Sequence, residues 1–230
     1  MTPTAQIDHL VIVADTLANG VKWCEETLGV TPGPGGEHKL MGTHNRLLRI
    51  ATVDFPRAYL EIIAINPVAP TPDPIRAGRW FDMDSPAMKK AVAEGGPRLV
   101  HFAANVPEMT PSLAALRELG IDRGPALEAS RMTPRGLLQW KITVRDDGQR
   151  LFDGAMPTLI EWGETHPASS MSDLGVTLTS LTVSHPKDGE LRRAYEALGL
   201  RNVGVKPGAA NLCAVLQTPR GRVQLESKGI

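Results

Sequence analysis

The sequence contains few aromatic residues, few cysteines and no long hydrophobic run. Phe, Trp and Tyr make up 4% of the 230 residues, so we expect an aliphatic core without the aromatic surfaces on which proteins stack bases. The longest apolar runs, such as residues 10–14 and 62–65, are far shorter than the ~20 residues that a membrane helix needs. The first ten residues contain no Lys or Arg, so we also expect no secretory signal.

A net charge is absent as well. The 25 basic and 25 acidic side chains cancel, and this balance favours neither a nucleic acid nor an anionic membrane as partner. Cys24 and Cys213 lack CxxC spacing, which predicts two reduced thiols in a cytoplasmic protein. We therefore expect a small molecule as partner, with no nucleic-acid or membrane partner, and the chain could also pair as a homodimer.

Glycine and proline are abundant, with 22 and 19 residues; they form about 18% of the chain against roughly 12% on average, which predicts many turns. The order strand, helix, strand, strand, strand occurs three times, beginning near residues 7, 99 and 178. All three helices end in Leu-Gly, at Gly29, Gly120 and Gly199, where a left-handed residue stops a helix. The repeat predicts an α+β fold of βαβββ modules, with curved mixed sheets around a cavity and helices outside.

The repeats also predict the division of the chain. We expect one domain over residues 1–165, formed by paired modules at 5–66 and 97–165, and a third, shorter half-module at 175–230. The connection between the paired modules is rich in proline and is expected to carry a short helix near residues 86–94.

Two histidines and two glutamates occupy repeated positions in apolar strands. His9 and His101 are third in the opening strands of the first two units, and Glu61 and Glu161 lie in their closing strands. An isolated buried carboxylate is costly, so such residues need a partner, a metal or water. If the units pair about a pseudo-twofold axis, the four side chains meet in a mixed site suited to Zn²⁺, Ni²⁺, Fe²⁺, Mn²⁺ or Co²⁺. A metal-free pocket or a structural polar network are the alternatives.

The same segments resemble a known superfamily. The resemblance is carried by the strand openings IDHLVIVAD and LVHFAANV, by the closings YLEIIAI and TLIEWGE, and by the run GGEHKLMGTHNRLLRI. The sequence is similar to the vicinal-oxygen-chelate superfamily over residues 5–165, and specifically to its glyoxalase-like domain branch. The resemblance implies a divalent metal held by His9, Glu61, His101 and Glu161, chelated by a substrate with adjacent oxygens. The extra half-module departs from the usual two-module arrangement.

Such a site suggests a reaction class. A metal that polarises a carbonyl makes the neighbouring C–H acidic, and Glu61 or Glu161 is the candidate catalytic base. We therefore expect a metal-dependent lyase or isomerase, glyoxalase-like or epimerase-like, acting on a small metabolite with vicinal oxygens. The alternatives are a metal-free binding or resistance protein of the same fold and an extradiol-type dioxygenase.

Further residues are candidates for substrate binding: His44, Asn45, Arg46, Arg135 and Trp140. The first three could hold a carboxylate or thiol, although a plain turn explains them equally well. Arg135 could pair with an anion and Trp140 could cover the substrate, but a surface Arg and a core Trp account for them as readily. We expect His38 to be exposed.

Overall fold

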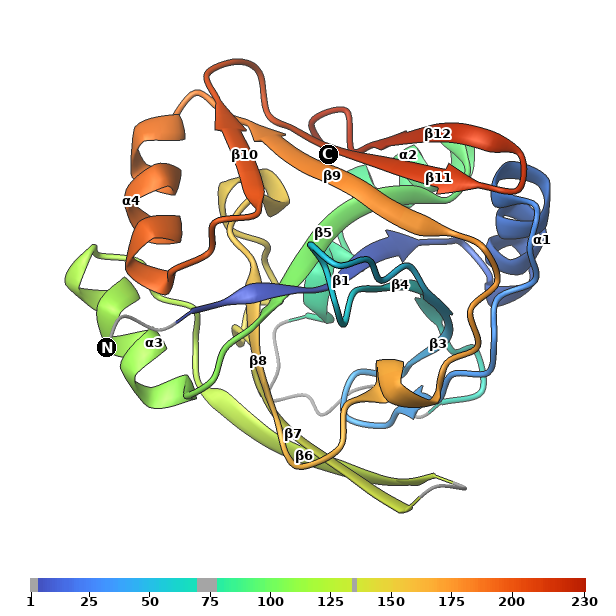
Figure 1. The fold of residues 1–230 in the computed structure, drawn as a ribbon, viewed down its shortest axis with the longest axis horizontal. Helices are drawn as coiled ribbons and strands as arrows, with labels where there is room; N and C mark the ends of the chain where they lie inside the picture. The colour runs from blue at the N-terminus through green and yellow to red at the C-terminus, as the bar shows by residue number, and fades with distance from the viewer. Residues whose placement is uncertain (1–3, 70–77, 134–135) are drawn as a thin grey trace.

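The computed structural model describes residues 4–69, 78–133 and 136–230 (Figure 1). The first repeat contains β1 (Gln6–Val13), α1 (Leu17–Leu28), β2 (Glu37–His38), β3 (Thr43–Arg49) and β4 (Tyr59–Ile65). The second contains β5 (Arg98–Asn105), α3 (Met109–Glu118), β6 (Ala126–Thr133), β7 (Gly136–Thr143) and β8 (Thr158–Trp162). The third contains β9 (Thr177–Ser184), α4 (Asp188–Leu198), β10 (Val203–Lys206), β11 (Asn211–Thr218) and β12 (Gly221–Glu226).

Short helices join these repeats. The connection from β4 to β5 carries the 3-10 turn η1 (Trp80–Asp82) and the predicted short helix, which is confirmed as α2 (Pro86–Gly95). The turns η2 (Phe152–Gly154) and η3 (Pro167–Ser170) flank β8. None of the helices in these described ranges is long and apolar enough to cross a membrane.

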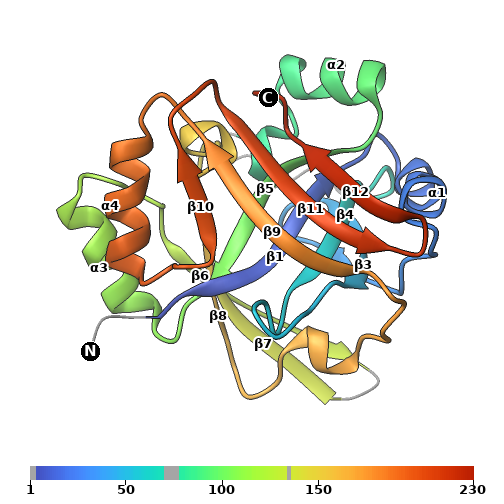
Figure 2. The ribbon, with the colours of Figure 1, turned by 45° about the horizontal axis from the view of Figure 1, so that its top comes forward.

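The first two repeats form one curled sheet of eight strands, in the order β2-β3-β4-β1-β5-β8-β7-β6. Antiparallel pairing of β1 with β5 joins the two halves at its centre. The third repeat forms a separate four-stranded sheet, β10-β9-β11-β12, which lies across β1 and β5 (Figure 2). The predicted α+β fold of curved, mixed sheets is therefore confirmed.

The alternation of side chains along β1 gives the curled sheet two different faces. Leu10 and Ile12 point outwards into the main core, which they share with α1, α3, α4 and the inner side of the third repeat's sheet. Val11 and Val13 point to the concave face, where α2 and η1 pack against them. The concave face is therefore closed by the crossover connection, and the polar residues that share this face are enclosed.

Local signals set the ends of α1. The hydroxyl of Thr16 accepts the N–H of Asn19 at 3.1 Å and so caps the first turn. Gly29, at φ 81°, ends the helix in the left-handed conformation that glycine adopts without strain. The helix therefore ends at the glycine that the sequence predicts.

Candidate functional site

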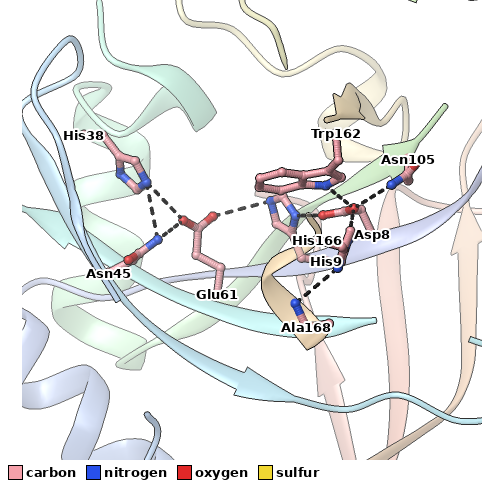
Figure 3. Close-up of polar contacts among 9 residues, drawn as sticks. All are labelled: Asp8, His9, His38, Asn45, Glu61, Asn105, Trp162, His166 and Ala168. Atoms are coloured by element: carbon pink, nitrogen blue, oxygen red, sulfur yellow. Dashed lines mark hydrogen bonds and ion pairs between the residues drawn. The ribbon is translucent and has the colours of Figure 1, made fainter. Parts of the chain in front are cut away.

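A β-bulge in β1 lies at two neighbouring ionisable residues. The register with β5 shifts immediately before His9, which changes the direction of side chains from that of a regular strand. Asp8 is fully buried and accepts hydrogen bonds from His9 Nδ1 at 2.6 Å, Trp162 Nε1 at 2.7 Å and His166 Nε2 at 2.9 Å. The Asp8 carboxylate thus fixes the His9 ring, whose Nε2 faces Glu61 (Figure 3).

Glu61 lies between two imidazoles, as Figure 3 shows. Its Oε2 is 3.6 Å from His9 Nε2, and its Oε1 is 3.8 Å from His38 Nε2. Asn45 donates from Nδ2 to Glu61 Oε1 at 2.6 Å and accepts the N–H of Gly36 at 2.8 Å. We call His9, His38, Asn45 and Glu61 the Glu61 cluster. The Glu61 carboxylate is buried, and among the described residues it accepts a hydrogen bond only from a neutral amide. The charges of both imidazoles therefore act on it.

The two imidazoles have opposite shifts in pKa. Burial lowers the pKa of His9, but the hydrogen bond and charge of Asp8, with the charge of Glu61, outweigh burial and raise the pKa above its ordinary value. Burial dominates at His38 and lowers its pKa despite the charge of Glu61. The Nδ1 of His38 lies 3.0 Å from Thr43 Oγ1, as a neutral ring with a proton on Nδ1 requires. The two shifts therefore favour the protonated form at His9 and the neutral form at His38, on either side of one carboxylate.

The Glu61 cluster lies in a cavity of about 50 Å³ with aromatic walls. Tyr59 stacks on His9 with ring centroids 4.7 Å apart, and Trp80 meets His38 edge-on at 4.8 Å. This cavity adjoins a groove of about 880 Å³, and both are lined by Leu47, Arg131, Leu138 and Pro167. The groove has the size of a small-molecule pocket, so it provides space for a ligand beside the cluster.

Arg131 of β6 lies at the junction between cavity and groove. Its Nε is buried and has no hydrogen-bond partner among the described residues. A Cβ on Gly36 would overlap Nη1 of Arg131, so the glycine-rich segment 33–36 permits this close approach. The junction thus presents a guanidinium suited to a carboxylate or phosphate group.

His101 is on the concave face but bonds away from the Glu61 cluster, contrary to the prediction. Its Nδ1 donates to the carbonyl of Gly154 at 2.9 Å, and its Nε2 accepts the N–H of Thr158 at 3.1 Å. The ring of Phe81 lies against it, with centroids 5.3 Å apart. Burial and the charge of Arg123 hold the pKa of His101 well below its ordinary value. Both ring nitrogens are engaged, so this histidine is a buried structural group.

Glu161 faces the opposite side of the sheet from the one predicted. In β8, Ile160 and Trp162 lie on the concave face, where both line the cavity and pack in the hydrophobic cluster beside it. Because side chains alternate along a strand, Glu161 points outwards. There it accepts the N–H of Met109 at the start of α3, at 2.5 Å, and pairs with Lys141 at 3.0 Å. This strand of the second repeat therefore presents isoleucine and tryptophan, and no carboxylate, to the cavity.

The predicted substrate-binding residues are divided between the two faces of the sheet. Asn45 is in the Glu61 cluster, and Trp140 lines the cavity. His44 and Arg46 alternate with Asn45 along β3 and line neither the cavity nor the groove. Arg135 lies outside the described residues.

The prediction that His38 is exposed is wrong. Its side chain is only 15% exposed, because the β2–β3 hairpin pairs it with Thr43 and turns it towards Glu61. His38, Thr43 and Asn45 lie in one short run of the sequence, which was the available signal that they belong to one site. To place His38 beside Glu61, however, one must know the register of the two-residue strand β2 against β3.

The sequence profile of the glyoxalase-like domain matches residues 7–199. The chain belongs to the glyoxalase-like domain family. No protein with a curated description matches it. Its structure is similar to that of a hypothetical protein from Staphylococcus aureus, with a TM-score of 0.57 and 13% identity over 90% of this chain and 87% of that one.

Two epimerases also match this glyoxalase-like chain. A methylmalonyl-CoA epimerase from Streptomyces coelicolor, in complex with 2-nitronate-propionyl-CoA, has 18% identity and a TM-score of 0.43 over 71% of this chain and 98% of its own. The methylmalonyl-CoA epimerase from Mycobacterium tuberculosis has 16% identity and a TM-score of 0.37 over 68% and 86%. The family and the fold predicted from the sequence are confirmed.

Relatives of the glyoxalase-like domain typically bind divalent metals, which require several side-chain donors around one point. Among the described residues, no group of three or more His, Cys, Asp or Glu side chains is arranged to hold a metal ion. His9, His38 and Glu61 have suitable donor atoms, but Asn45 occupies one oxygen of Glu61. The predicted ligands of the second repeat bond elsewhere. This donor set does not fit a divalent metal ion.

Proposed function

We propose that this glyoxalase-like domain is a lyase or isomerase that transfers a proton on a small metabolite with vicinal oxygens. The observation that supports this function is the position of Glu61 between His9 and His38, two imidazoles whose pKa values are shifted in opposite directions. Neighbouring titratable groups with separated pKa values are typical of acid–base catalysis. Membership of the family agrees with this reaction class but specifies no substrate.

In the proposed reaction, a C–H bond next to a carbonyl breaks and its proton passes to Glu61. The electron pair of that bond moves onto the carbonyl oxygen, to which protonated His9 donates from Nε2. The 3.6 Å between His9 Nε2 and Glu61 Oε2 is too long for a hydrogen bond between them, so both atoms can turn to a substrate. Return of the proton from Glu61 to the former carbonyl carbon, while the neighbouring hydroxyl gives its proton to His9, completes the isomerisation.

Two neighbours would prepare this chemistry. Asn45 holds one oxygen of Glu61 at 2.6 Å, which leaves the other oxygen as the base. Arg131, at the junction of cavity and groove, would bind a carboxylate or phosphate group of the substrate. We therefore propose an anionic substrate that extends from Glu61 into the groove.

Exchange of carbon-bound hydrogen tests this function without knowledge of the natural substrate. A panel of 2-oxo and 2-hydroxy acids is incubated with the protein in D₂O, and loss of the α-proton is followed by NMR. We expect Glu61→Gln to lower the exchange rate by a factor of about 10² or more. Glu161→Gln is the matched control, because it makes the same change on the outer face of the other closing strand. Equal rates in the two variants would contradict the proposal.

The metal-dependent form of the proposal makes a different prediction for the same variants. A metal held by His9, Glu61, His101 and Glu161 would be lost from both glutamine variants, which metal analysis of untagged protein detects. The arrangement of the donors supports the metal-independent form, in which a chelator leaves the exchange rate unchanged. Stoichiometric Zn, Ni, Fe, Mn or Co that depends on both glutamates would overturn it.

A metal-free binding protein is the second candidate, and the composition of the cavity favours it specifically. Tyr59, Trp80, Trp140 and Trp162 surround the carboxylate of Glu61, and aromatic rings with a carboxylate bind organic cations. Quenching of tryptophan fluorescence by quaternary ammonium compounds, with no proton exchange on any acid of the panel, would support binding over catalysis.

A further inference from the structure

A second, smaller cavity shares Trp80 and Phe81 with the cavity of the Glu61 cluster. Its volume is about 20 Å³, which is enough for one water molecule or one monatomic ion. Three guanidinium groups line it, from Arg123, Arg145 and Arg150. The described residues that line this cavity include no carboxylate. Its wall is therefore rich in positive charge.

Two of these arginines have acidic partners and the third does not. Arg145 bonds to Asp147 at 2.5 and 3.0 Å, and Arg150 bonds to Asp82 at 2.8 Å. Arg123 is only 3% exposed, and Nη2 makes its one hydrogen bond among the described residues, at 2.8 Å to a threonine hydroxyl. Its Nε and Nη1 are buried with no partner there. Buried donors without an acceptor are unfavourable, so the edge of Arg123 requires an acceptor, and its positive charge favours an anionic one.

Other properties of the cavity agree with this requirement. Burial lowers the pKa of Arg123 to about 10, so the side chain still carries its charge at neutral pH. Trp80 also lines the cavity, and its Nε1 donor is likewise buried and unpartnered within the described ranges. Exposed Gln149 is among the lining residues, which gives a route for exchange with solvent. The atoms left unsatisfied are all donors.

We propose that this cavity binds one small monovalent anion of halide size, held by Nε and Nη1 of Arg123. The cavity volume excludes phosphate and organic acids, and an anion compensates the charge of Arg123 directly, whereas Asp122 and Asp147 act on it without a hydrogen bond. The anion would connect the loop before β6 with the β5–β8 region through Thr158 and His101. This site is independent of the reaction proposed for Glu61.

Thermal unfolding in chloride and in gluconate, at equal ionic strength, tests the site. An anion bound only by the folded state raises the folding equilibrium constant about tenfold for each tenfold rise in concentration above its Kd. We therefore expect the Tm of the wild-type protein to rise with chloride and not with gluconate. Arg123→Met should lose this rise, and Arg193→Met, which changes an exposed arginine of α4, should keep it. Wild-type protein insensitive to chloride, or an equal rise in both variants, would overturn the proposal.

Bromide replaces chloride in a crystallographic test that needs no variant. We expect an anomalous difference peak within hydrogen-bond reach of Arg123 Nη1 in crystals of the wild-type protein soaked in bromide. A water at that position without anomalous signal would contradict the anion site, even where Arg123→Met fails to fold.

Discussion

Asp8 sets the protonation of His9 through a hydrogen bond of 2.6 Å. The pKa of His9 is raised, so its proton stabilises the fold below about pH 6.5, and this contribution is lost as the pH rises through the raised pKa. Removal of the Asp8 charge should lower the His9 midpoint, because the hydrogen bond and the charge of Asp8 raise the pKa. NMR titration of Asp8→Asn measures this shift directly.

The control for Asp8→Asn is His44, which lies on the other face of the sheet. Its titration midpoint should be the same in wild-type protein and variant. An unchanged His9 midpoint in Asp8→Asn would show that burial, and not Asp8, determines the protonation of the Glu61 cluster.

The sequence predicted His9 and Glu61 as neighbours, and they are neighbours, but it did not predict what surrounds them. Asp8 is adjacent to His9 in the chain and would face away from it in a regular strand. The bulge in β1 changes this, and bulges have no signal in an alternating apolar run. His38 depends in the same way on strand register. Register is a tertiary property, so single residues do not reveal it.

Among the elements, the segment 33–36 before β2 positions two side chains of the site. A Cβ on Gly36 would displace the flexible guanidinium of Arg131 and leave the backbone unobstructed. We expect Gly36→Ala to weaken binding of an anionic ligand about tenfold, or about 1.4 kcal/mol, while the free energy of unfolding changes by less than about 0.5 kcal/mol. Titration with the acids of the panel, followed by tryptophan fluorescence, measures the affinity.

Gly189→Ala is the matched glycine variant, because an added Cβ there meets no atom within 4 Å. Its ligand affinity should equal that of the wild-type protein. If Gly36→Ala also binds as tightly, Arg131 does not contact the ligand.

The strands and helices themselves were predictable from the sequence: α1 ends at the predicted Gly29, and α2 covers the predicted residues 86–94. The error at β8 is one of alignment. Glu61 is the third residue of its strand and Glu161 the fourth, and one position reverses the face in a strand. The repeated motif therefore predicted the strands and helices correctly, but it predicted the wrong face of the sheet for Glu161.

At the scale of the whole molecule, the third repeat shares its core with the first two. Leu212 of β11 is fully buried in the cluster that also contains Leu10 and Phe102. Leu212→Ala should lower the free energy of unfolding by about 2–5 kcal/mol. All four tryptophans precede residue 165, so their fluorescence in urea reports on the first two repeats.

Because Leu212 is in the third repeat and all four tryptophans precede residue 165, urea unfolding of Leu212→Ala tests whether the two parts of the chain unfold together. We propose that residues 1–165 and 175–230 unfold together, in which case the tryptophan transition of Leu212→Ala moves to lower urea. An unchanged transition, with a second one visible by circular dichroism, would mean that residues 175–230 unfold on their own.

The groups that can give or take a proton in the cavity all come from the first repeat, whereas the wall from β7 and β8 consists of leucine, isoleucine and indole side chains. A substrate between these walls can lose its hydrogen on one side only, and its planar enolate can regain hydrogen on that side only. The proposed reaction is therefore suprafacial: the hydrogen reaches the neighbouring carbon on the same face of the enolate that it left.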